Sequence, residues 1–270
     1  MRDRAKMSLP LRRALLIGLL TGGVVLSACG RNRAPSAAST TTTSAIAATT
    51  TTATTVAPTT TTTGPPPSLA PYEGLFPFAT AADAETWRAG YEDGGHDPWH
   101  LDSGQVAVAF AGWLGYSGID TVTATRTDRT GAHVGVGLRT GESADRTTTA
   151  AVVHLVRWGA APDAPWEVVG TDDTTFTLAA PAYGATVASP LRAGGRISGV
   201  DESIRVQVRA TQGSSAAGAA CCLPAGGEAT PWSMTVSFAA PAGSVLVVAA
   251  QTGGHVAAVE RFAVTAVRVR

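Results

Sequence analysis

The sequence predicts an α+β module followed by an all-β sandwich, both placed behind a signal peptide and a low-complexity segment. Three observations lead to this fold class. Apolar residues recur at helical spacing between residues 80 and 114, the spacing changes to strict alternation from residue 120, and further alternating segments continue to the end of the chain. Helices before a run of alternating strands indicate layered α+β packing, whereas short strands with regular turns indicate a sandwich.

Residues 1–28 are expected to form a lipoprotein signal peptide. A basic segment precedes an apolar run from Ala14 to Leu26, which is too short for a permanent membrane span. The stretch Leu26–Cys29 resembles the lipobox of bacterial lipoproteins. That resemblance implies cleavage before Cys29 and attachment to its sulfur of a diacylglyceryl group carrying fatty acids such as palmitate. The alternative is an ordinary cleaved signal in which Cys29 is incidental.

Residues 29–70 are expected to form a disordered stalk. They contain the threonine runs Thr40–Thr43, Thr49–Thr52 and Thr59–Thr63, and they lack periodic apolar residues that could form a core. Lipid and stalk together predict a protein held by its anchor on the extracytoplasmic face of the cell membrane. Because the formal net charge is +0, we expect no nucleic-acid partner.

Residues 71–173 are expected to form the α+β module. Thr80, with Asp83 three residues later, can cap a helix that stops at Gly94, and Ser103, with Asp102 before it, can cap a second helix. Strands are expected at 120–127, 132–139, 148–158 and 166–169, with a turn at 128–131. This order of elements resembles cystatin-like and nuclear-transport-factor-2-like (NTF2-like) folds, in which a helix packs into a curved antiparallel sheet.

Residues 174–270 are expected to form the sandwich. Alternation is strict at Ile204, Val206 and Val208, and strands are expected at 176–181, 232–238, 244–250 and 256–269. A proline and glycine pattern precedes the first of these apolar alternations: Pro181, Gly184, Val187, Ser189–Leu191, Gly195, Ile197 and Gly199. The pattern resembles the immunoglobulin-like domain of bacterial spore germination (Gmad2), which also occurs in other cell-surface lipoproteins. The expected interior consists of Ile197, Ile204, Val206, Val208, Trp232, Met234, Val236, Phe238, Leu246, Val248, Phe262 and Val264.

Cys221 and Cys222 are adjacent in a chain that we expect to be exported, where disulfides persist. Neighbouring cysteines close only a strained ring, so a vicinal disulfide, two free thiols and intermolecular pairing are all open alternatives. The glycine-rich and alanine-rich residues 213–227 around the pair are expected to form a loop.

The histidines supply the candidate site residues. His96 and His100 are four residues apart beside acidic residues, but glycines and Pro98 interrupt any helix there, so we expect no metal site and no cofactor. Trp99 and His100 belong to an aromatic loop that is a candidate binding surface, although Trp99 could instead cover the end of the core. His133 and His154 lie in expected strands, opposite the main valine face, where a concave sheet could hold a pocket.

These features predict a protein that is not an enzyme. We expect an adaptor or binding module at the cell envelope, with an envelope protein or a cell-wall polymer as partner, because sandwich domains present loops and edges for contact. The alternative is a small-ligand-binding protein or an enzyme that uses the concave sheet, with His133 or His154 as the base.

The lipobox leads to a direct test. Cys29→Ser removes the sulfur that would carry the acyl chains, so the protein should move from the membrane fraction to the soluble fraction of the cells. Immunoblotting of the two fractions measures this shift. A variant that stays with the membrane would contradict the lipoprotein interpretation.

Overall fold

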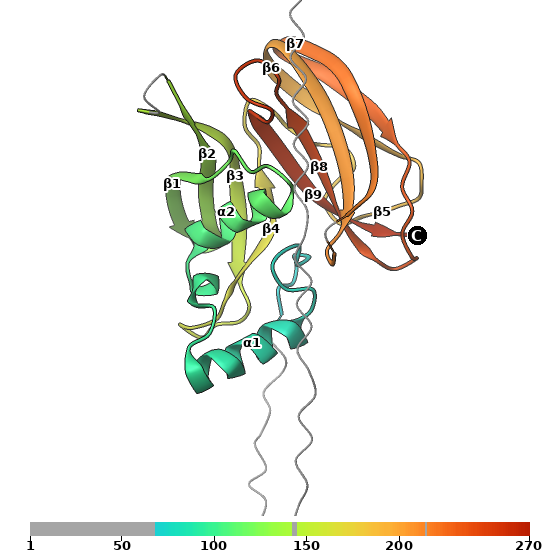
Figure 1. The fold of residues 1–270 in the computed structure, drawn as a ribbon. Helices are drawn as coiled ribbons and strands as arrows, with labels where there is room; N and C mark the ends of the chain where they lie inside the picture. Colours follow the sequence, from blue (N-terminus) through green and yellow to red (C-terminus); the bar gives the residue numbers. More distant parts are fainter. Residues whose placement is uncertain (1–67, 142–144, 214) are drawn as a thin grey trace, which may run out of the picture. The chain divides into compact units, whose positions relative to one another are not determined.

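The computed structural model describes residues 68–141, 145–213 and 215–270, which belong to one compact unit (Figure 1). The expected signal peptide, Cys29 and the stalk as far as residue 67 lie outside the described residues. The described part of the chain is mostly β, with two α-helices, one short 3₁₀ helix and two sheets. None of its helices has the length and apolar character needed to cross a membrane.

Both helices begin at polar caps. In α1 (Ala81–Gly94) the Thr80 side chain accepts from the Asp83 backbone N–H, and Gly95 ends the helix in the left-handed region, as predicted. In α2 (Ser103–Trp113) the cap is Asp102 rather than Ser103. Asp102 Oδ1 accepts from the backbone N–H groups of Gly104 and Gln105, at 2.8 and 3.1 Å, which have no partner within the first turn of the helix.

The first sheet is antiparallel and contains the four strands expected in the α+β module. These are β1 (Thr121–Asp128), β2 (Gly131–Thr140), β3 (Arg146–Arg157) and β4 (Trp166–Asp172), in the spatial order β1-β2-β3-β4. The predicted turn at 128–131 joins β1 to β2. Helix α2 packs on one face of this sheet, which is the layered arrangement that the change of period predicted.

The second sheet is antiparallel except for one short parallel pair. Its strands are β5 (Ala185–Val187), β6 (Leu191–Ala210), β7 (Ala216–Val236), β8 (Val245–Thr252) and β9 (Arg261–Val269), in the order β5-β9-β8-β6-β7. The parallel pair is β5 with β9.

Three sequence expectations for this second sheet are wrong. Residues 216–227, expected in a loop, belong to β7, because the glycines and alanines there pair along β6 at an edge of the sheet. Residues 176–181 contribute isolated bridges through Phe176 and Ala180 rather than a strand. Of the expected strand 256–269, only the part from Arg261 is extended, since Glu260 Oε1 accepts from the N–H groups of residues 255–257 and holds a tight loop.

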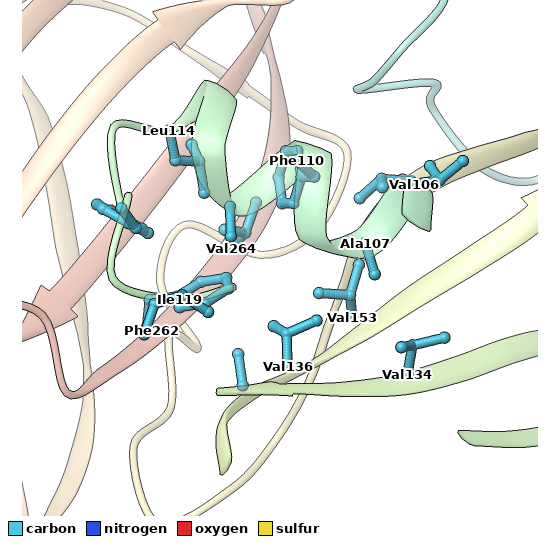
Figure 2. Packing of buried hydrophobic residues seen from close by; sticks show 14 of the residues in the cluster. Val106, Ala107, Phe110, Leu114, Ile119, Val134, Val136, Val153, Phe262 and Val264 are labelled. Atoms are coloured by element: carbon cyan, nitrogen blue, oxygen red, sulfur yellow. The ribbon is translucent and has the colours of Figure 1, made fainter. Parts of the chain in front are cut away.

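Strands β8 and β9 contribute side chains to two separate hydrophobic cores. Val247, Ala249, Phe262 and Val264 join the first core, which also contains residues of α2, β2, β3 and β4. Figure 2 shows this meeting of the helix with β2, β3 and β9. The intervening residues of β8 and β9 join the second core, which they form with β6 and β7: Leu246, Val248, Ala250, Ala263 and Val267. Because side chains alternate across a strand, one pair of strands serves both cores.

The residues expected in the sandwich interior are therefore nearly all buried, but two of them belong to the other core. All of them are buried except Met234, which is half-buried. Phe262 and Val264, however, face the first core rather than the second. A hydrogen bond also joins β9 to β4, in which Val264 N–H donates to the Thr171 side-chain Oγ1 at 2.8 Å.

A segment before α1 covers the outer edge of β4. Leu75 N–H donates to Val168 O at 2.9 Å, and Val168 N–H donates to Phe76 O at 2.7 Å. Next to this pairing, Glu167 is fully buried and its Oε2 accepts from Phe78 N–H and Trp158 Nε1, both at 3.1 Å. Burial raises the pKa of Glu167 to about 8, because the hydrogen bonds offset only part of the cost of removing the carboxylate from water.

The raised pKa of Glu167 predicts how stability depends on pH. The folded protein keeps a proton on Glu167 up to about pH 8, whereas the unfolded chain releases it near the ordinary glutamate pKa of 4.5. Stability therefore falls as pH rises through this range. The slope is at most about 1.4 kcal/mol per pH unit. Glu167→Gln should abolish this contribution. Urea unfolding at about pH 6.5 and about pH 8 measures it.

Glu228→Gln, at an exposed glutamate of β7, is the matched control and should keep the wild-type dependence. Equal pH slopes for wild type and the Glu167→Gln variant would show that the buried carboxyl does not hold its proton.

Candidate functional site

His100 and Trp99, adjacent in the candidate loop, have different surroundings. His100 is 7% exposed, and its ring centroid lies 4.8 Å from that of Phe78 and 5.0 Å from that of Trp87. Burial lowers the pKa of His100 to about 4, which keeps the ring neutral. His100 is thus part of an aromatic cluster beneath the surface, and Trp99 stacks on it with a centroid distance of 3.7 Å.

Trp99 lines an apolar groove between α2 and β1 with a volume of about 460 Å³. The side chain of Val122, 41% exposed, belongs to the same groove. A Cβ at Gly104 would lie 3.2 Å from Val122 Cγ2, so the glycine allows the first turn of α2 to approach β1 closely. The groove lining consists of Trp99, Gly104, Gln105, Val108, Ala109, Asp120 and Val122.

This groove contains one of the few large hydrophobic side chains that are exposed among the described residues. Only three large hydrophobic side chains among the described residues are strongly exposed, namely Val122, Tyr183 and Val256. Val122 is the one that lies beside a half-buried tryptophan in an apolar groove. Exposed apolar surface with a polar rim is typical of contact sites. Trp99 packs against the first core and also lines the groove, so both interpretations of it from sequence describe part of its environment.

His133 and His154 face each other across β2 and β3. They occupy paired positions in the sheet, and their rings stack with a centroid distance of 4.5 Å. His133 Nδ1 lies 2.7 Å from Asp172 Oδ2 at the end of β4. A carboxylate only accepts hydrogen bonds, so Nδ1 is the donor in this pair, while Nε2 lies 3.2 Å from Thr130 Oγ1 and 3.6 Å from Asp128 Oδ2.

A cavity of about 350 Å³ lies beside this pair, lined by His133 and Asp172 together with Thr125, Arg126 and other residues of β1 to β3. The cavity gives the histidine a path to solvent, although the His133 side chain itself is 8% exposed. Among the described residues, no group of three or more histidine, cysteine or acidic side chains is arranged to hold a metal ion. What the arrangement offers chemically is a histidine oriented by a carboxylate.

A disulfide joins Cys221 and Cys222 on the exposed edge strand β7. Cys221 lines a cavity of about 470 Å³ together with Tyr116, Arg205 and Gln251. The cysteines line neither the apolar groove nor the cavity beside the histidine pair. The candidate binding residues lie at two places, Trp99 with His100 and His133 with His154.

Two important side chains were not singled out by sequence reasoning. Val122 lies in the strand expected at 120–127, but its exposure depends on β1 lying at the edge of the sheet. Asp172 lies beyond the strand expected at 166–169, whereas it ends β4 and pairs with His133 from β2. A histidine and an acid on separate strands with unknown register give no local signal that they meet.

Comparison with known proteins adds no relative: no protein-family model, no curated protein and no solved structure matches this chain.

Proposed function

We propose that this chain is a membrane-anchored extracytoplasmic lipoprotein that acts as a non-catalytic binding or adaptor module at the cell envelope. The lipobox at Leu26–Cys29 and the threonine-rich stalk support the anchoring. We also propose that the first module has a cystatin-like or NTF2-like fold and that the second is immunoglobulin-like and similar to the Gmad2 domain.

The apolar groove between Trp99 and Val122 is the observation that carries the binding function. Trp99, which packs against the first core, and the exposed Val122 together form an apolar surface. Apolar and aromatic side chains held in this way contribute most of the binding energy at protein interfaces. A protein partner at the envelope would bury this groove. The polar surroundings at Gln105 and Asp120 supply the rim.

A charge in the groove tests this function. Val122→Asp places a carboxylate in the apolar groove where the partner would bind. Because the native side chain is already exposed, the fold should tolerate the change. In-cell crosslinking of the anchored protein through a photoreactive residue at exposed Thr127 should yield a complex whose amount falls roughly tenfold or more in the variant.

Val256→Asp is the matched control, because Val256 is also an exposed valine, at 64%, but lies in the loop between β8 and β9. It should leave the complex unchanged. Equal complex formation in both variants, or no complex with the unsubstituted protein, would reject the groove as the binding site.

The hydrogen bond between His133 and Asp172 favours a second candidate function, in which the sheet face opposite α2 binds a small polar ligand or performs a hydrolytic step. His133 Nε2 would act as general base on a water molecule, and Asp172 would hold the ring in the required tautomer. The adjacent cavity would admit the ligand.

Hydrolysis of p-nitrophenyl acetate by the purified mature protein tests this second function. His133→Gln should lower the rate about a hundredfold, as loss of a general base does. His255→Gln, at an exposed histidine outside this face, should have no effect. Equal rates in the two variants would exclude a catalytic role for His133.

A further inference from the structure

We propose that the edge of β1 binds an extended peptide as an additional strand of the first sheet, with an apolar side chain of that peptide in the groove between Trp99 and Val122. This inference rests on the proposed binding function and names the partner as a segment of extended polypeptide. It also names the backbone of β1 as the element that recognises it.

The four sheet edges of the described residues differ in how well they are protected. The edge of β4 is occupied by the pairing of Leu75 and Phe76 with Val168. The β5 edge consists of only three residues, Ala185–Val187. Strand β7 is long but carries Pro224 and Pro231, which lack N–H groups, and its register with β6 is shifted at several points.

Strand β1 is less protected among the described residues: no segment pairs with its outer edge, and its register with β2 shifts once, between Val122 and Ala124. It is eight residues long, contains no proline, pairs on one side with β2, and is exposed over most of its length. Such an edge presents a row of free N–H and C=O groups at the spacing of a partner strand. Only an extended backbone satisfies this row, so the edge itself specifies a peptide rather than a small molecule.

The hairpin determines which backbone groups of β1 are free. Asp128 and Gly131 flank a two-residue turn and face each other, so Asp128 directs its backbone groups towards β2. The direction alternates along the strand, so the N–H groups of Thr127 and Thr125 point away from β2. Both residues are exposed.

The groove adds side-chain selectivity to this backbone recognition. A strand added beside β1 would place one side chain about 5 Å from Val122 on the face that carries α2, which is the face of the groove. At the rim, Asp120 is exposed and forms no ion pair among the described residues, whereas Arg126 and Asp128 are paired with each other. The preferred peptide therefore has an apolar residue in the groove and a lysine or arginine near Asp120.

Removal of a single free N–H group tests the proposal. Thr125→Pro deletes an N–H that would donate to the peptide, while the bonds to β2 remain; Thr125→Val keeps the N–H and changes only the side chain. The probe is a short fluorescein-labelled peptide of alternating valine and threonine with arginine at one end, titrated against the purified mature protein by fluorescence anisotropy. Thr125→Pro should weaken binding about tenfold or more, and Thr125→Val should leave it unchanged.

A second measurement does not depend on how the proline variant folds. N-methylation of alternate amides of the same peptide removes its own donors and should abolish binding to the unsubstituted protein. Equal binding to the proline and valine variants, retention of binding by the methylated peptide, or no binding of the unmodified peptide would each overturn strand addition. The crosslinked complex of the Val122 test is independent of this peptide, so a complex that survives Thr125→Pro would leave the adaptor function standing and remove only strand addition.

Discussion

The burial of β8 and β9 on both faces is the constraint on which the rest of the structure depends. Val247 and Ala249 alternate with Leu246 and Val248, so adjacent residues of one strand enter different cores. A sheet buried on both faces is normally found between helical layers, and such strands have nearly continuous apolar sequence. Here the same requirement links the first sheet and α2 to the second sheet, because β8 and β9 contribute side chains to both hydrophobic cores.

This shared burial explains why the candidate sites lie where they do. The strands of the first sheet that contact β9 are β3 and β4, and α2 covers the face that carries Val134, Val136 and Val153. The cavity beside the histidine pair lies on the opposite face, and the apolar groove lies at the β1 edge. The binding function and the chemical alternative therefore use different surfaces of one sheet.

Much of the fold could be predicted from local pattern because helix caps and alternation are local signals. Thr80 and Gly95 bound α1 as expected, and the hairpin turn at 128–131 is in place. The pattern failed in β7, where glycine and alanine have little strand propensity and pairing with β6 overrides it. The same limit applies to the sites: Trp99 could be selected as an aromatic residue of a loop, but its position beside Val122 depends on how α2 and β1 pack.

The covered edge of β4 also determines how the domain meets mechanical load. A pull on the amino-terminal end of the described chain reaches the two hydrogen bonds that join Leu75 and Phe76 to Val168 before it reaches α1. Force applied along paired strands loads their hydrogen bonds in shear, together rather than one after another. The hydrogen bond from Phe78 N–H to Glu167 comes next along the chain and would resist the same force before α1 is reached.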